Sequence, residues 1–362
     1  ASPITFCATP PSQARAAGNA PADTELDWMA RLSKTNKAPV VYSLAQFHSD
    51  PEIWRNMVAA TERANAGGAQ VYAGVGNRCT GVLLSWEGNL NPFTSCPSFK
   101  ALGAISREEL KAKLSDPAFK AKLISEQPEF EEQFDDNDNL ISRREIFEGV
   151  TFNYKNMFSM EGAEGIEYEP SAEMSIAAIA EREGKNPREV IYDYLSSDDG
   201  HATLFYPIAN YAYGNYDHVL DMFDSPAVVS SLSDGGAHVG LICDASQPTF
   251  MLTHWVRDRK RGKRMSLERA VQLQTSATAA VYGFDDRGSI EVGKRADLNI
   301  IDLEKLYIGR PEIHFDLPTN AKRFLQKPEG YVATFVAGQI IRENGEDTGA
   351  RPGRLIRASA MH

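Results

Sequence analysis

The stretch 232–240 holds the residues best suited to chemistry, because a carboxylate stands there among glycines. Asp234 is followed by Gly235 and Gly236, and an apolar run at 228–232 precedes it. That run has the length and composition of a buried strand. A carboxylate at the carboxyl end of a buried parallel strand lies where barrel enzymes place their catalytic groups. An Asp-Gly pair also closes many ordinary turns, so the stretch alone leaves both interpretations open.

Two polar residues follow Asp234 on the same segment. His238 comes four residues later, where an imidazole could contact substrate or assist proton transfer. The alternative is a loop histidine held by backbone hydrogen bonds. Asp244 could support the same site, or it could cap a helix that runs through Phe250. We therefore treat His238 as a candidate catalytic residue and Asp244 as a candidate substrate-binding residue.

Three further candidates for substrate binding come from other segments. Arg78 follows a strand expected at 70–75. Its guanidinium could bind a substrate carboxylate through two parallel hydrogen bonds, or it could form a structural salt bridge. Asn210 follows a strand expected at 204–208. His254 lies in an apolar helical stretch, where a hydrogen-bonded core histidine is the alternative to a substrate contact.

Strand and helix patterns alternate through the first part of the chain. Strands are expected at 3–7, 39–44 and 70–75. The helices between them are expected to begin near Asp23 and at Asp50. Asp50 is followed by Pro51, which suits the first turn of a helix. Such alternation predicts a parallel sheet or barrel whose strands are joined by crossover helices.

A helical insertion at about 85–200 interrupts the alternation. Within it, Ser106 and Glu109 form a capping-box pattern that predicts a helix start. Strands expected at 204–208 and 228–233 then extend the earlier pattern. The strands still fall short of a complete (β/α)8 barrel. Either the sheet is open, or the early strands are missing from this chain.

The end of the chain is rich in strand-forming residues between 288 and 345. Two runs, 296–302 and 331–341, alternate apolar and polar residues or carry β-branched side chains. We expect these two runs to pair in a small second sheet.

Composition excludes several classes of partner. The formal net charge of -11 argues against binding to nucleic acid or to an anionic membrane. The basic run at 257–264 is local, and we expect it to be a solvated helix end.

Four scattered cysteines do not form a disulfide framework, which favours a reducing, cytoplasmic location. No apolar run reaches the roughly 18 residues of a membrane span.

The segment from Thr275 to Asp302 resembles the carboxyl-terminal signature of the amidohydrolase superfamily. Its features are a helix that ends in Gly283, an Arg-Gly-x-Ile turn at 287–290, and Gly-x-x-Ala-Asp-Leu before a strand at 293–298. The closer likeness is to the N-acyl-D-amino-acid deacylase (D-aminoacylase) branch. That likeness rests on Asp-Gly-Gly-Ala-His-Val-Gly from position 234 and on Asp-Ala-Ser-Gln-Pro-Thr-Phe from position 244.

The resemblance implies a metal-dependent hydrolase of amide C–N bonds with a (β/α)8 TIM-type barrel and a small C-terminal β-sandwich. Residues 1–287 would form the barrel portion with its insertion, and 288–362 the sandwich portion and tail. A divalent metal, for which zinc is the first choice, would polarise the amide carbonyl and ionise a water molecule. Asp234 matches the family's metal ligand and general base. The implied substrate is an N-acyl amino acid or a related small amide.

The sequence departs from the family at two metal-binding positions. The His-x-His pair of the first barrel strand is missing, since the seven histidines are all isolated. This absence fits a chain that lacks the N-terminal part of the barrel. In addition, Leu44 stands where deacylases carry a metal-binding histidine, and the nearest histidine is His48. We therefore expect one metal ion or none, rather than two.

The departures leave a second hypothesis open. The chain could be a non-catalytic or split amidohydrolase-like subunit whose metal-binding strands are lost or lie on another chain. Its partner would then be an N-terminal companion chain, and a homo-oligomer is the other assembly we consider.

Overall fold

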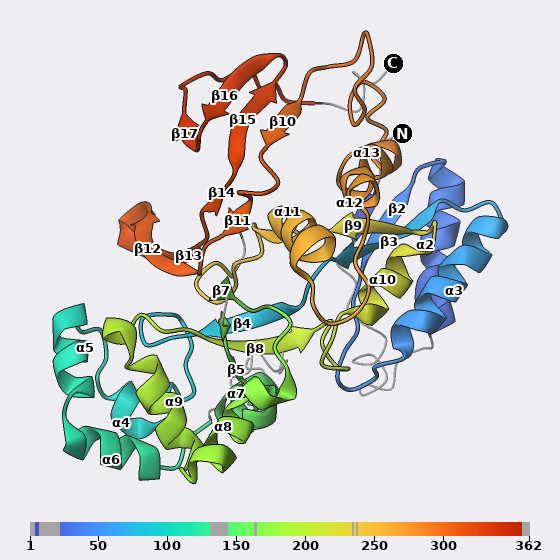
Figure 1. The fold of residues 1–362 in the computed structure, drawn as a ribbon. Coiled ribbons are helices and arrows are strands. Elements are labelled where there is room, and N and C mark those ends of the chain that lie inside the picture. The colour runs from blue at the N-terminus through green and yellow to red at the C-terminus, as the bar shows by residue number, and fades with distance from the viewer. Residues whose placement is uncertain are drawn as a thin grey trace.

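The computed structural model describes residues 4–6, 22–130, 144–162, 165–233, 235–236 and 238–356. A four-stranded parallel sheet forms its amino-terminal part, with strand order β1-β2-β3-β9. Figure 1 shows this sheet beside α2, α3 and α10, with the insertion helices at the far end of the molecule. The four strands are β1 (Ile4–Phe6), β2 (Val40–Leu44), β3 (Val71–Gly76) and β9 (Val228–Ser231).

Helices cover both faces of the parallel sheet, as its alternating side chains require. On one face, Val40 and Tyr42 pack in the main core with α2 (Ala22–Asn36) and α3 (Ile53–Ala66). On the other face, Val41 packs in a smaller cluster with Val229 of β9 and Val281 of α13. The remaining helices near this sheet are α10 (Asp217–Phe223), α12 (Leu267–Gln274) and α13 (Ser276–Val281).

The strand expected at 204–208 does not join the parallel sheet, and this part of the prediction was wrong. It forms β8 (Leu204–Ala209), which pairs antiparallel with β4 (Thr80–Leu84) and with β5 (Phe158–Ser159). The reason is topological. The chain turns directly from β3 into β4 at the start of the insertion, and β8 returns beside β4 at its end (Figure 1). Antiparallel pairing is what such a direct return produces.

The insertion has a hydrophobic core of its own, which includes Trp86, Phe93 and Leu123. The expected capping box is present: Ser106 Oγ accepts from the amide of Glu109, and the Glu109 carboxylate accepts from the amide of Ser106. The helices are α4 (Pro97–Lys100), α5 (Arg107–Leu114), α6 (Pro117–Ser125), α7 (Arg144–Phe152), α8 (Ile176–Glu183) and α9 (Pro187–Leu195), and the short strands β6 (Glu161–Gly162) and β7 (Gly165–Ile166) pair between α7 and α8.

The two C-terminal runs pair as expected, because β10 (Leu298–Ile301) lies antiparallel to β15 (Tyr331–Val336). The run 331–341 is a hairpin rather than one strand. Ala337 and Gly338 both have positive φ, 51° and 76°, as a tight two-residue hairpin turn requires. Strands β16 (Gln339–Glu343) and β17 (Glu346–Asp347) extend the same sheet. Two further pairs lie outside it. One is β11 (Tyr307–Ile308) with β14 (Pro328–Glu329), and the other is β12 (Glu312–Leu317) with β13 (Ala321–Leu325).

These C-terminal strands make one four-stranded sheet and two two-stranded ribbons, so the sandwich stays a prediction. Within the described ranges, no helix is long and apolar enough to cross a membrane.

Candidate functional site

The carboxyl ends of β2, β3 and β9 meet at one edge of the parallel sheet. Leu44 pairs with Val75, and Gly76 pairs with Ser231. The apolar run before Asp234 therefore does form a strand of this sheet, as the sequence predicts. Asp234 itself lies outside the described residues. Its metal-binding and catalytic roles stay predictions, and the structure describes only the strand that leads to it and the residues around its loop.

Arg78, which follows β3, and Asp244, which lies ten positions after Asp234, are in contact with each other. The Arg78 Nη2 atom donates to the Cys243 carbonyl oxygen at 2.6 Å and lies 3.5 Å from Asp244 Oδ1. The guanidinium also stacks over the Tyr168 ring, 4.1 Å from its centroid. Both charged side chains are at most 4% exposed. This geometry is that of the structural salt bridge, and a role in substrate binding stays a prediction.

Side-chain amides fix the backbone at the same edge. The Asn210 Oδ1 atom accepts from the Gln46 amide at 2.8 Å, which ties the loop after β8 to the loop after β2. The Asn77 side chain donates through Nδ2 to the Gln247 backbone carbonyl oxygen at 3.0 Å. The Asn77 backbone N–H donates to the Gln247 side-chain oxygen Oε1 at 3.1 Å. Asn210 is buried, and its Oδ1 atom is engaged by the bond from Gln46. Sequence reasoning missed Asn77 and Gln247. The two residues are 170 positions apart, so no local sequence pattern indicates that they form hydrogen bonds with each other.

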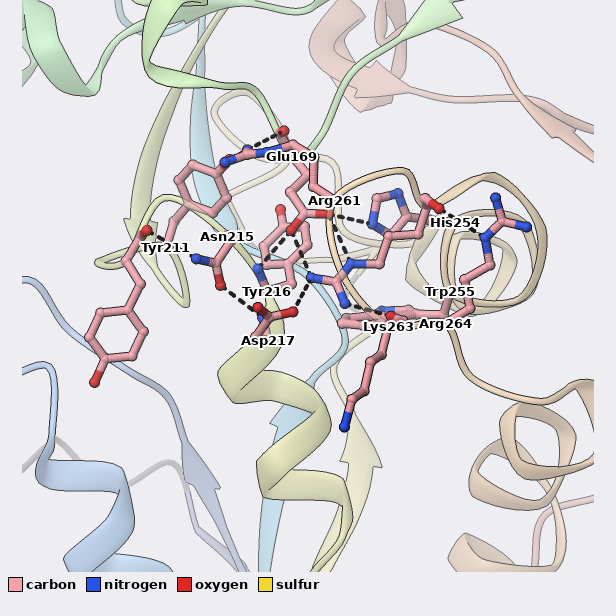
Figure 2. Close-up of polar contacts among 12 residues, drawn as sticks. Glu169, Tyr211, Asn215, Tyr216, Asp217, His254, Trp255, Arg261, Lys263 and Arg264 are labelled. Carbon is pink, nitrogen blue, oxygen red and sulfur yellow. Dashed lines mark hydrogen bonds and ion pairs between the residues drawn. The ribbon is translucent and has the colours of Figure 1, made fainter.

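His254 lies in a cluster of charged groups around Glu169 (Figure 2). The His254 Nε2 atom donates to Glu169 Oε2 at 3.0 Å. Arg259 donates to both carboxylate oxygens, at 3.1 and 2.9 Å, and the Tyr216 amide donates at 2.9 Å. Burial by itself raises the pKa of Glu169, but these hydrogen bonds and the Arg259 charge outweigh it and lower the pKa to about 2.

The helix that carries His254 is not a regular α-helix. After the short α11 (Gln247–Phe250), the chain continues as a π-helix, η4 (Met251–Asp258). Wider turns of this kind occur often at functional sites. The imidazole stacks on Phe250 with ring centroids 4.5 Å apart. It also lines a cavity of about 720 Å³.

Arg259 corrects the prediction that the basic run is a solvated helix end. The side chain of Arg259 is fully buried, and it pairs with Asp217 at 2.8 Å as well as with Glu169. Sequence reasoning missed both Glu169 and Arg259. The two are 90 positions apart, and a buried ion pair has no local sequence signal.

His238 has an exposed side chain and a positive φ of 53°. Its carbonyl oxygen accepts from the amides of Leu241 and Ile242 at 2.7 and 3.0 Å. The backbone therefore forms the turn, and the imidazole is open to solvent. A catalytic role for His238 stays a prediction.

The described residues do not fit a metal centre. No three His, Cys, Asp or Glu side chains within those ranges are placed to hold one ion. Leu44 closes β2 as a buried side chain without a ligating atom.

Comparison with known proteins gives one broad match and several distant ones. No curated protein matches this chain. A solved structure of a D-aminoacylase mutant with copper chloride shares 16% identity over 92% of this chain and 52% of that one, with a TM-score of 0.44. Another D-aminoacylase structure shares 17% identity over 90% and 51% of the two chains, with a TM-score of 0.42.

An N-acyl-D-glutamate deacylase from Bordetella bronchiseptica, complexed with zinc and a phosphonate inhibitor, shares 16% identity. That match covers 88% of this chain and 50% of the other, with a TM-score of 0.37. The chain thus spans about half the length of these solved structures. The sequence model of the amidohydrolase family matches residues 12–342, which is most of the chain. The chain therefore belongs to the amidohydrolase family.

Proposed function

We propose that this chain serves in the hydrolysis of amide C–N bonds, with an N-acyl-D-amino acid or a related small amide as substrate. The observation that supports the proposal is the family match over 12–342, which includes Asp234. The fold adds that β9, the strand leading to Asp234, belongs to the parallel sheet. The carboxyl ends of such strands are where barrel enzymes carry their catalytic groups.

In this proposal Asp234 is the general base. Its carboxylate takes a proton from a water molecule as the water oxygen bonds to the amide carbonyl carbon. It then gives that proton to the amide nitrogen as the C–N bond breaks. The products are a carboxylic acid and a free amine.

The proposal includes zinc, as one ion with Asp234 among its ligands. The described residues supply no cluster of further ligands. The remaining ligands would come from residues near Asp234 or from a companion chain.

The test measures amine release from paired N-acetyl-D- and N-acetyl-L-amino acids by the purified protein, with and without added zinc. We expect hydrolysis of the D-forms, and we expect Asp234→Asn to lower kcat by about 10²–10⁴-fold. Asp224→Asn is the matched control, because it changes an exposed carboxylate next to α10. Activity retained in the Asp234 variant would remove that residue from the mechanism.

The same assay tests His238. His238→Ala should lower kcat/KM, since the imidazole is exposed on the loop that follows Asp234. An unchanged value would leave His238 with only its turn-forming role. A wild-type protein that is inactive even with zinc would support the non-catalytic or split subunit instead.

A further inference from the structure

A cavity of about 720 Å³ lies beside the π-helix η4. Its walls come from three segments, 161–174, 250–264 and 307–308. No described residue of the Asp234 loop, 232–246, lines it. The volume lies in the range of pockets that hold small molecules.

His254 uses one of its two ring nitrogens for a bond to a described residue. Its Nε2 atom is held by Glu169, whereas Nδ1 has no hydrogen-bond partner among the described residues. Glu169 already accepts two bonds from Arg259 and one from the Tyr216 amide. The His254 bond therefore adds to the other contacts that stabilise the buried carboxylate. What the contact with Glu169 does is fix the plane of the ring at the cavity wall.

The charged groups on the cavity wall divide into paired and available ones. Glu169 is neutralised by Arg259, and Asp258 is held by both ends of the Arg257 guanidinium at 2.5 and 2.8 Å. Among the described residues, Arg261 and Arg264 are the wall cations that form no ion pair, and the wall also carries Lys260 and the carboxylates Glu161 and Glu167.

Within the part of the chain that the structure describes, these two arginines bond only to neutral groups. Arg261 Nη1 donates to the carbonyl oxygens of Glu169 and Pro170 and lies 3.4 Å from the Tyr211 hydroxyl. Arg264 donates through Nε to the Arg259 carbonyl oxygen at 2.8 Å, and its two terminal nitrogens have no partner within the described ranges. No carboxylate in the described ranges therefore bonds to either guanidinium.

The rest of the wall is apolar or aromatic. Its side chains are Ile166, Tyr168, Met174, Phe250, Tyr307 and Ile308, with the hydroxyl-bearing Thr253 as the one exception among the described lining residues. A wall of this kind beside unneutralised guanidinium groups suits a molecule with an apolar body and one anionic end.

We propose that this cavity binds a small organic acid. Its carboxylate would meet Arg261 and Arg264, while its hydrocarbon part packs against Phe250, Met174 and Ile308. Because Nε2–H of His254 donates to Glu169, Nδ1 is an acceptor and would meet an N–H or O–H group of the ligand rather than its carboxylate. The inference concerns binding only and does not rest on the proposed hydrolysis. An N-acyl amino acid shares this chemistry, so the cavity could serve the proposed substrate or a separate effector.

The test uses 4-phenylbutyrate, which has a carboxylate and an apolar chain but no amide bond to cleave. Its binding is measured by isothermal titration calorimetry, with the neutral 4-phenylbutyramide as the matched ligand. We expect saturable binding of the acid and at least about tenfold weaker binding of the amide. Arg264→Gln should weaken binding of the acid by about tenfold or more, because the variant loses only one protein contact besides the ligand. Arg351→Gln, at an exposed pair with Asp347, is the control.

Three outcomes would overturn the inference. They are absence of saturable binding up to about 10 mM acid, equal affinity for acid and amide, or equal affinity of wild type and the Arg264 variant. A thermal melt of each variant shows whether it is folded, and Arg261→Gln repeats the test at the second guanidinium. Amide hydrolysis measured on the same variants then separates the two sources of ligand. A raised KM assigns the cavity to the substrate, and unchanged hydrolysis with weaker acid binding assigns it to an effector.

Discussion

Arg78 and Asp244 form an ion pair 3.5 Å apart in which both side chains are almost completely buried. The pair joins the end of β3 to the segment ten positions after Asp234. Together with the bonds between Asn77 and Gln247, it holds the far end of the loop that carries the proposed base. The near end of that loop is held by the pairing of β9 with β3.

We predict that Arg78→Met lowers the free energy of unfolding by about 3–5 kcal/mol, because it leaves the Asp244 charge buried without its cation. Urea denaturation at neutral pH measures this loss. Arg351→Met is the control: its pair with Asp347 is 68% and 48% exposed, so its loss should be much smaller than that of the buried pair. Equal losses in the two variants would contradict a stabilising role for the buried pair.

Glu169 should make the protein sensitive to strong acid. Its pKa is lowered from 4.5 to about 2 in the folded state. A depressed carboxyl pKa contributes stability that is complete above pH 4.5 and is lost as the pH falls toward 2. The shift corresponds to about 3 kcal/mol.

We therefore predict that Glu169→Gln lowers the melting temperature at pH 6 and flattens its dependence on pH below 4.5. Thermal melts between pH 6 and 3 measure both effects. Glu304→Gln, at an exposed carboxylate, is the control. A Glu169 variant whose melting temperature follows the wild-type curve in acid would show that the cluster around Glu169 contributes no such stability.

His218 should make stability fall at milder acidity. Burial lowers the pKa of His218 from 6.5 to about 4, and both ring nitrogens lack a hydrogen-bond partner among the described residues. The unfolded chain therefore binds a proton below pH 6.5 that the folded protein binds only near pH 4. Stability is full above pH 6.5 and is lost as the pH falls toward 4.

We predict that His218→Leu removes this slope, because leucine cannot titrate and the ring nitrogens give up no protein hydrogen bond. Urea midpoints at pH 7, 5.5 and 4.5 measure the slope. His314→Leu, at a partly exposed histidine on β12, is the comparison. An unchanged slope in the His218 variant would show that His218 is not the titrating group.

Gly81 sets the close approach of β4 and β8. A Cβ atom at position 81 would lie 2.4 Å from a ring carbon of Phe205 and 2.9 Å from the Tyr206 carbonyl oxygen. Gly81→Ala should therefore destabilise the protein by about 1–3 kcal/mol in urea denaturation. Gly353→Ala meets nothing within 4 Å and should have little effect. A Gly81 variant as stable as wild type would mean that β4 and β8 can separate at no cost.

Local features of this protein could be predicted from the sequence because they depend on neighbouring residues. The capping box of Ser106 and Glu109 closes within one helical turn. The strand before Asp234 carries its signal in a short apolar run, and the family signature at 275–302 is read as contiguous sequence.

Other features were decided only by the tertiary structure, because they depend on segments that are far apart in the chain. The residues 204–209 have strand composition, but only the return of the insertion pairs them antiparallel with β4. Arg78 and Asp244 were both candidates, but only packing makes them each other's partner. The basic run predicts exposed charge, yet Arg259 is buried because Glu169 reaches it from 90 positions away. Burying a charge requires a partner of opposite sign, and that partner is supplied by the fold and not by the neighbouring sequence.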